Sequence, residues 1–243
     1  MNTVDFSNSI AVTRDIHWLG FHESDHGLHC NPYLLVDDQD VLLIDPGSVP
    51  DFPVVMRKVL DVVDLHAITY IVAQHQDPDV CGNIPVAEDV IENPGLMVVA
   101  QAETVRLIQH LGIKSKFLGV NRNHSLTLKS GRVIDFIATP YLHSPGAMIT
   151  YDRKTKSLFT SDIFGSIDTK EWGLFAGSDQ AIEAMRPWHQ LYMPSSRILR
   201  PCIEMIEKMD VVRILPQHGS ILEGEYISKA IAMLKELPCG VDL

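Results

Sequence analysis

The sequence has no uninterrupted apolar run of about 18 residues, the length that a membrane-spanning helix needs. The first residues, 1–6, also lack the basic and apolar regions of a secretory signal peptide. Both absences lead us to expect a cytoplasmic protein with no membrane contact.

Positive charge is also scarce. The 243 residues include 20 Lys and Arg against 31 Asp and Glu, which gives a formal net charge of −11. Binding to the phosphate backbone of a nucleic acid depends on clustered Lys and Arg. We therefore expect no nucleic-acid partner.

Cysteine is present but not in pairs. Cys30, Cys81, Cys202 and Cys239 show no C-x-x-C spacing. This argues against a thiolate zinc site and gives no disulfide framework. Reduced thiols in a cytosol are the simplest interpretation.

Hydrophobic residues make up 46% of the chain, and we expect residues 1–243 to form one domain.

Apolar, β-branched runs predict strands at 10–21, 31–36, 41–44, 68–73, 96–100, 125–151 (two or three strands, broken at 129–131), 158–160 and 211–215. Helical patterns cover 53–63 (with Asp51 as N-cap), 84–91, 102–111, 180–209 (interrupted around Pro187, Pro194 and Pro201) and 225–237. Two halves, each of strands followed by helices, predict an α+β fold with two sheets face to face and helices outside.

The most informative segment is 69–80, Thr-Tyr-Ile-Val-Ala-Gln-His-Gln-Asp-Pro-Asp-Val. Residues 68–73 predict a buried strand that ends in a loop. If this loop stays extended, His75, Asp77 and Asp79 point to one side, because side chains alternate along an extended chain. One imidazole and two carboxylates that converge beyond a buried strand form a metal-site geometry. The alternative is an acidic, solvated loop, and the segment alone does not decide between them.

Three further residues occupy the same kind of position. His143, Asp162 and His218 each follow an apolar, strand-like run and lie close to Gly or Pro. Each alone is more typical of a capped loop residue than of a ligand. The ordered set His-x-Asp-x-Asp, His, Asp, His is much more specific, because ligands from the ends of separate strands can surround an ion while the sheet holds them rigidly.

With these motifs the chain resembles the metallo-β-lactamase superfamily, and within it the di-iron domain of flavodiiron proteins. The short oxygen-binding di-iron proteins that lack a flavodoxin domain are the closer match. Residues 29–36, 41–47 and 188–196 also carry the resemblance. Zinc hydrolases of the superfamily have His-x-His-x-Asp-His, whereas this chain has Asp77 and Val80 in place of the second and last His. Flavodiiron proteins usually have Glu at the first of these two positions.

The resemblance implies an αββα sandwich of two mixed sheets, the metallo-β-lactamase fold, with a site for two metal ions. Six side chains would bind them: His75, Asp77 and His143 for one ion, Asp79 and His218 for the other, and Asp162 as a bridge. Three imidazoles and three carboxylates suit two iron ions, with zinc or manganese as alternatives. Because Val80 cannot be a ligand, the second ion has few protein ligands, and water or a diatomic gas can occupy its open positions.

Other residues would support the metals. By the same resemblance, His26 is the candidate for a direct role in the oxygen chemistry, against the alternative of an exposed loop histidine, and His22 and His29 are weaker candidates. Asp45 is expected to orient a metal-bound His through a carboxylate–imidazole hydrogen bond, or only to form a turn.

The remaining residues near the motifs carry weaker expectations. Cys81 is not expected to be a ligand, because its side chain should face away from Asp79. Three aromatic side chains are candidates for an apolar pocket over the metals, although aromatic residues usually only pack: Phe164, Trp172 and Phe175. Ser144 and Ser161 are not convincing nucleophiles, since no oxyanion motif accompanies them.

We therefore expect a non-haem di-iron protein that binds dioxygen as a sensor or store, since two ferrous ions can each give one electron to O₂. Resembling reductases receive further electrons from a C-terminal flavodoxin that carries FMN. We expect no flavodoxin domain within residues 1–243 and no flavin bound by this chain. Reduction of O₂ or nitric oxide, as an oxidoreductase, would then need an external redox partner. A signalling partner and a homodimer are further hypotheses.

Two other functions stay open. One is a zinc-dependent hydrolase of the same fold that acts on a lactone or thioester, in which a metal-bridging hydroxide attacks a carbonyl. The missing second and last His of the hydrolase motif argue against it. The other is a binding protein with a degenerate site, and the presence of all six expected ligand types argues against that.

Overall fold

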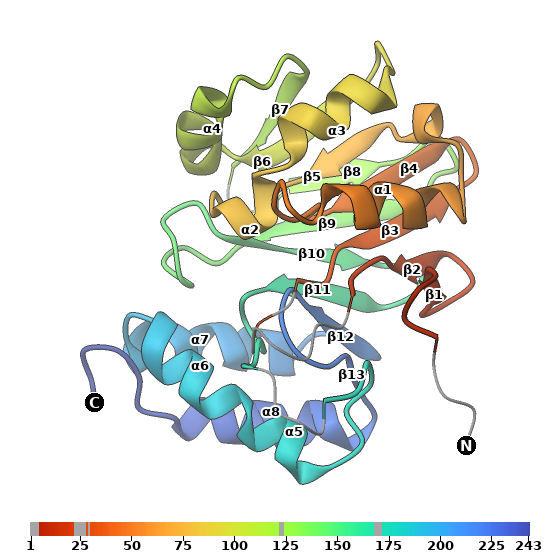
Figure 1. Cartoon of the computed structure of the whole chain (residues 1–243). Coiled ribbons are helices and arrows are strands. Elements are labelled where there is room, and N and C mark those ends of the chain that lie inside the picture. Colours follow the sequence, from red (N-terminus) through yellow and green to blue (C-terminus); the bar gives the residue numbers. More distant parts are fainter. Residues whose placement is uncertain (1–4, 22–27, 29, 122–123, 168–171) are drawn as a thin grey trace.

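The computed structural model of the chain describes residues 5–21, 28, 30–121, 124–167 and 172–243. Two β-sheets lie face to face at the centre, and helices cover the outer face of each (Figure 1). The predicted α+β sandwich of two mixed sheets, with helices outside, is therefore confirmed.

The first sheet has 7 strands in sequence order. They are β1 (Ile10–Ala11), β2 (Ile16–Trp18), β3 (Tyr33–Asp37), β4 (Asp40–Ile44), β5 (Tyr70–Val72), β6 (Met97–Gln101) and β7 (Lys116–Val120). Strands β1 to β4 pair antiparallel, and β4 to β7 pair parallel. The parallel part needs crossover connections, and helices provide them.

The second sheet has 6 strands in the order β13-β12-β11-β10-β9-β8. They are β8 (His124–Thr127), β9 (Val133–Ala138), β10 (Met148–Asp152), β11 (Ser157–Ser161), β12 (Arg213–Pro216) and β13 (Leu222–Glu223). Only β11 and β12 pair parallel. The carboxyl ends of these two strands therefore meet at one edge of the sheet.

Helices form the two outer layers (Figure 1). Beside the first sheet lie α1 (Phe52–Leu60), α2 (Pro78–Cys81), α3 (Ile84–Ile91) and α4 (Ala102–Ile108), with the 3₁₀ turns η1 (Leu65–Ala67) and η2 (Gln109–Leu111). Beside the second lie α5 (Asp179–Glu183), α6 (Met185–Tyr192), α7 (Ser196–Glu207) and α8 (Glu225–Glu236). Among the described residues, no helix has the length and apolar character needed to cross a membrane.

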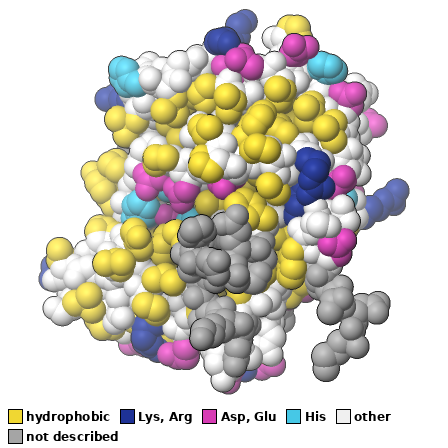
Figure 2. Space-filling view, in the orientation of Figure 1, with side chains coloured by type: hydrophobic (Ala, Val, Ile, Leu, Met, Phe, Trp, Pro, Cys, Tyr) yellow, Lys and Arg dark blue, Asp and Glu magenta, His cyan; other side chains and the backbone are white. Residues whose placement is uncertain are grey.

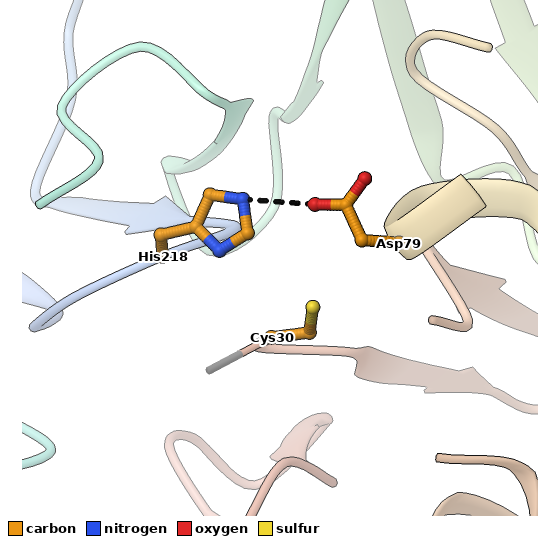
Figure 3. Close-up of side chains that lie close together, drawn as sticks. All are labelled: Cys30, Asp79 and His218. Carbon is orange, nitrogen blue, oxygen red and sulfur yellow. Dashed lines mark ion pairs between the residues drawn. The ribbon is translucent and has the colours of Figure 1, made fainter. Parts of the chain in front are cut away.

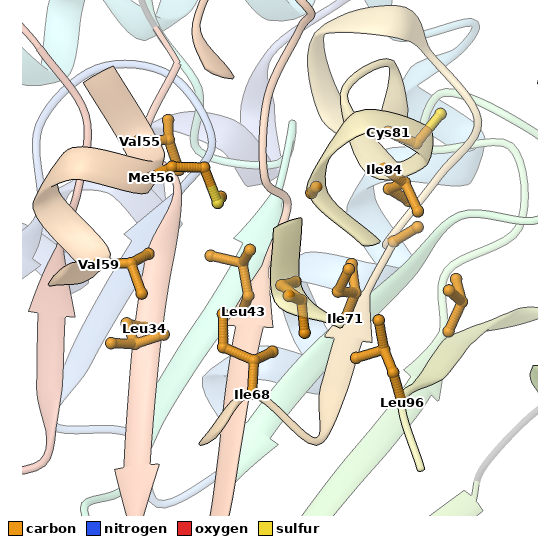
Figure 4. Packing of buried hydrophobic residues seen from close by; sticks show 14 of the residues in the cluster. Leu34, Leu43, Val55, Met56, Val59, Ile68, Ile71, Cys81, Ile84 and Leu96 are labelled. Carbon is orange, nitrogen blue, oxygen red and sulfur yellow. The ribbon is translucent and has the colours of Figure 1, made fainter. Parts of the chain in front are cut away.

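The apolar core has three layers, and β4 shows why. Leu42 and Ile44 point between the two sheets, whereas Leu43 points outward, because successive side chains of a strand face opposite ways. In Figure 4, Leu43 faces Val55 and Val59 of α1. A strand that is covered on both faces has apolar residues at nearly every position, which explains the continuous apolar pattern of this segment.

Some predicted elements differ from the observed ones. Residues 10–21 were expected to form one strand but form the hairpin β1–β2, because the Thr13 hydroxyl accepts hydrogen bonds from the backbone N–H groups of Asp15 and Ile16 and closes a turn. The short strands β7 and β13 were not predicted. Asp51 precedes α1 as expected, but its carboxylate accepts hydrogen bonds from Ser48 rather than from the helix.

The three prolines expected to interrupt the segment 180–209 do not act alike. Only Pro194 lies between helices, at the break from α6 to α7. Pro187 lies in the first turn of α6, where a missing N–H breaks no hydrogen bond of the helix. Pro201 lies inside α7, whose buried apolar face packs against α8 and offsets the lost bond.

A buried ion cluster joins the two sheets at one end. The Arg132 guanidinium, before β9, donates two hydrogen bonds to the Asp152 carboxylate, from Nε at 2.9 Å and from Nη2 at 2.5 Å. Its Nη1 lies 3.1 Å from Asp15, in the turn between β1 and β2, and 3.3 Å from Asp37, at the end of β3. Burial alone would raise the pKa of Asp152, but Arg132, together with hydrogen bonds from Thr155, outweighs burial and lowers it.

We predict that Arg132→Met destabilises the fold by about 3–5 kcal/mol, because it leaves the buried carboxylate of Asp152 without a counter-charge. A carboxyl group with a depressed folded-state pKa stabilises the fold above its unfolded pKa of about 4. This stabilisation is lost as the pH falls through the folded-state pKa. Without Arg132 the folded-state pKa of Asp152 rises, so acid unfolding should begin at higher pH. Urea unfolding from pH 3 to 7 measures both effects.

The matched control is Arg153→Met. Arg153 pairs with Asp135 at 2.6 Å, but its side chain is 57% exposed. Its removal should barely change the urea midpoint, because water already solvates this pair. Equal losses in the two variants would contradict the structural role of the buried cluster.

Candidate metal centre

The six side chains singled out in the sequence converge at one edge of the sandwich. His75 lies just beyond β5, Asp162 follows β11 directly, and His218 lies just beyond β12. His143 belongs to the connection between β9 and β10. Figure 2 shows His and acidic side chains gathered in a band at mid-height on one face, with hydrophobic side chains around it.

Among the described residues, three sets of side chains bring their ligand atoms within 4.8 Å of one another, close enough to hold a metal ion. They are His75, His143 and Asp162; His75, Asp77 and Asp79; and Cys30, Asp79 and His218.

The first part of the centre is the His75 group, formed by His75, Asp77 and His143. Nε2 of His143 lies 2.7 Å from Oδ2 of Asp162 and 3.3 Å from Oδ2 of Asp77. Nε2 of His75 lies 3.6 Å from each of the same two oxygens. Two imidazoles thus face two carboxylate oxygens around one small space.

The second part is the His218 group, formed by Asp79 and His218. Nε2 of His218 lies 3.2 Å from Oδ2 of Asp79 and 3.6 Å from Oδ1 of Asp162. The two oxygens of Asp162 therefore face different groups, Oδ2 the His75 group and Oδ1 the His218 group.

The chain reaches Asp79 by a helical turn, not by an extended loop. Asp77 is extended, with φ −70° and ψ 149°, and α2 begins at the next residue, Pro78. The extended loop that we expected therefore ends at Asp77, although the ligand atoms of His75, Asp77 and Asp79 do converge as expected. Proline is favoured in the first turn of a helix, so Pro78 starts the turn that directs Asp79 toward His218.

His75 is held from behind by a serine. Nδ1 of His75 lies 2.8 Å from the Ser161 hydroxyl, which leaves Nε2 directed at the carboxylates. Asp45 was expected to form a hydrogen bond to a metal-bound His or only to form a turn, and the first of these alternatives is wrong. Its carboxylate accepts hydrogen bonds from the backbone N–H and the side-chain amide of Gln74, and so positions the segment that carries His75. Asp45 and Ser161 have positive φ values of 48° and 51°, a conformation that costs free energy for residues other than glycine.

The aromatic side chains beside the centre come from α6. The Trp188 indole N–H donates a hydrogen bond of 2.9 Å to the backbone carbonyl of Asp162, and its ring lies 4.8 Å from that of His218. The Tyr192 ring lies 6.1 Å from that of His143. Sequence analysis placed the segment 188–196 within the resemblance but missed these contacts.

Two of the three aromatic residues that were proposed to line the metal pocket, Trp172 and Phe175, lie elsewhere. Trp172 packs against Phe6 and Trp18. Phe175 is exposed, whereas Phe164 is buried and lies two residues after Asp162 in the sequence. His26, His22 and His29 lie outside the described residues.

The electrostatics of the centre are those of a cation site. Burial would lower the pKa of His143, but the carboxylates of Asp162 and Asp77 outweigh burial and raise it to about 10. The imidazoles of His143 and His75 hold the pKa of Asp77 far below its usual value. For Asp162, burial is opposed by three imidazoles, which lower its pKa to about 2. Protons on the imidazoles therefore supply positive charge that a metal ion can replace.

Two buried atoms of the centre support the same conclusion. Nε2 of His75 and Oδ1 of Asp162 make no hydrogen bond among the described residues. A buried polar group without a partner costs about 1–3 kcal/mol. Coordination of a metal ion would satisfy both atoms, so the donor set fits the metals that the sequence suggests.

The fold has counterparts among known proteins. A model of the family described as ODP family beta lactamase matches residues 28–219. A solved structure of the peroxy diiron species of the chemotaxis sensor ODP superposes with a TM-score of 0.83. It is 25% identical and covers 96% of this chain and 97% of the sensor chain.

Curated relatives are longer proteins. A putative diflavin flavoprotein A 2 from Synechocystis is 30% identical over 92% of this chain and 39% of the relative. An anaerobic nitric oxide reductase flavorubredoxin from Enterobacter is 27% identical over 88% of this chain and 48% of the relative. The chain thus spans less than half the length of these two relatives.

We predict that Ser161→Ala weakens metal binding by about 10–100-fold, because loss of a partner that orients a ligand typically has this effect. The fold should be retained. Titration of metal-free protein with Fe²⁺ without oxygen measures the affinity. Ser157→Ala is the control, since Ser157 is also buried in β11 but bonds to Thr155 and Arg213, far from the imidazoles. Equal affinity in the wild type and Ser161→Ala would remove Ser161 from this role.

Proposed function

The chain belongs to the ODP family of beta-lactamase-type proteins, and from this premise we propose that it is a non-haem di-iron protein that binds dioxygen. The similarity to the ODP sensor, whose solved structure contains a peroxy diiron species, supports the proposal. So does the set of side chains at the edge of the sandwich.

The observation that carries the proposal is the position of the Asp162 carboxylate. One of its oxygens lies 2.7 Å from the His75 group and the other lies 3.6 Å from His218. In two-metal sites the ions are about 3.5–4 Å apart, a distance that one bridging carboxylate spans. We assign the ligands as expected from the sequence: His75, Asp77 and His143 for the first ion, Asp79 and His218 for the second, and Asp162 for both.

The donor atoms favour iron, with zinc or manganese as the alternatives. Three imidazoles and three carboxylates are borderline to hard donors, which iron, manganese and zinc accept. When bound, two ferrous ions supply two electrons to dioxygen. The chain itself would hold the ions through Asp162, and it places the rings of Trp188 and Tyr192 beside the imidazoles of His218 and His143.

We favour a sensor or a store over a fast reductase. The ODP sensor matches this chain along 97% of its own length, whereas the nitric oxide reductase flavorubredoxin is matched along 48%. Repeated reduction of O₂ or nitric oxide would need electrons from a flavin-carrying protein or domain beyond the sandwich. A sensor would instead pass its state to a signalling partner.

A zinc hydrolase of the same fold is the less favoured function. Asp77 and Val80 replace two histidines that the hydrolases of the superfamily carry. Val80 is buried in the apolar cluster beneath α1 and α3, where it offers no ligand atom. The family match and the relatives described above point to di-iron proteins instead.

We predict that protein purified without oxygen contains about two iron ions per chain, as a two-metal site requires. Addition of O₂ should produce a visible absorption band. Asp162→Ala should lose both ions and the band, because it removes the ligand that the two ions share. Asp210→Ala is the control, since Asp210 is exposed and pairs only with Lys156. Inductively coupled plasma analysis and stopped-flow absorption give the two readouts.

Two outcomes would contradict the proposal. One is zinc as the only bound metal, together with rapid hydrolysis of a lactone or thioester. The other is a wild-type iron content in the Asp162→Ala variant.

A further inference from the structure

A cysteine lies against the His218 group. Cys30 precedes β3 and is buried, with 8% of its surface exposed. In Figure 3 its sulfur points to the gap between the imidazole of His218 and the carboxylate of Asp79. The ligand atoms of these three residues all lie within 4.8 Å of one another.

The backbone around Cys30 is fixed to the segment that carries His218. The next residue, Asn31, donates hydrogen bonds to the carbonyls of Pro216 and Gly219, at 3.0 and 2.9 Å. Its backbone N–H donates to the carbonyl of Gln217 at 2.7 Å. These hydrogen bonds connect Asn31 to residues before and after His218 in the sequence. They therefore hold Cys30 beside His218.

The spacing suits one metal ion. First-row metal ions bind sulfur at about 2.3 Å and nitrogen or oxygen at about 2.0–2.2 Å, so two donors on one ion are about 3 to 4.5 Å apart. A second observation points to an ion at the same place. Oδ1 of buried Asp162 makes no hydrogen bond among the described residues, and it lies 3.6 Å from Nε2 of His218.

A thiolate here would compensate for a missing ligand. Val80 stands where resembling proteins carry the last His of the motif, and its side chain packs in the apolar core. Without another donor, the second ion would have only Asp79, His218 and one oxygen of Asp162. The sulfur of Cys30 approaches the same group from the first sheet and adds a fourth donor.

We propose that Cys30 is a thiolate ligand of the second metal ion, so that this ion is bound by sulfur, nitrogen and oxygen. The inference rests on the proposed two-metal site. Binding exchanges the S–H proton of Cys30 for the metal ion, and the proton is released to solvent. A soft sulfur donor distinguishes this ion from the first, whose ligands are nitrogen and oxygen only.

The other cysteines lack this geometry. Cys81 is near the centre, but its sulfur lies 3.2 Å from the backbone carbonyls of Gln76 and Asp77, to which its S–H donates. Cys202 and Cys239 pack in the apolar cluster beneath α7 and α8. Cys81 is therefore the control for a thiol close to the centre. Cys202 is the control for a buried thiol far from it.

The test uses the whole chain with Co²⁺, because cobalt bound to a thiolate gives an intense near-ultraviolet charge-transfer band that nitrogen and oxygen ligands do not give. Metal-free wild-type protein should bind two Co²⁺ and develop this band with one of the two. Cys30→Ser and Cys30→Ala should lose the band and bind the second ion at least about tenfold more weakly. Cys81→Ala and Cys202→Ala should keep it. Cobalt-edge X-ray absorption of the wild type, which needs no variant, should show one sulfur for every two cobalt ions at about 2.3 Å.

The outcomes separate the two proposals. Two bound ions without a band and without a sulfur neighbour would overturn the role of Cys30 and leave the two-metal site intact. Retention of the band in Cys30→Ser would also overturn the role of Cys30 and leave the two-metal site intact. Binding of a single ion, with no band, would contradict the two-metal site and the thiolate ligand together.

Discussion

The carboxylate of Asp162 is the group on which the rest of the centre depends. It is buried at the end of β11, its Oδ2 faces His75 and His143, and its Oδ1 faces His218. A buried carboxylate is costly unless positive charge surrounds it. Three imidazoles provide that charge through protons, which metal ions can replace. This arrangement, with donors on both sides of one carboxylate, is the reason why we propose two metal ions as its occupants.

The fold supplies this arrangement by bringing strand ends from both sheets to one edge. The imidazole of His75 comes from the first sheet, and Asp162 and His218 come from the parallel strands of the second. The sandwich must therefore keep the register of its sheets for the donors to meet. This arrangement includes backbone strain. Asp45 and Ser161, which position Gln74 and His75, both have positive φ values. The buried Arg132 cluster ties the sheets together at a separate place.

The sequence predicted most of the fold because buried strands and amphipathic helices follow apolar periodicity. It failed at β7, a strand with partly exposed residues, and at residues 10–21, where the Thr13 hydroxyl closes a turn. The six candidate ligands could be found because each follows a strand end. The roles of Ser161 and Cys30 could not be found in this way, because they depend on how one segment packs against another far away in sequence. Ser161 precedes Asp162 directly, and this was the one local signal for it.

The central claim is that two metal ions are bound on either side of the Asp162 carboxylate. Anomalous X-ray diffraction at the iron edge, from crystals grown without oxygen, tests it most directly. The account predicts two iron peaks about 3.5–4 Å apart, one beside His75 and His143 and the other beside Asp79 and His218. A single peak, or two peaks that do not share Asp162, would contradict it.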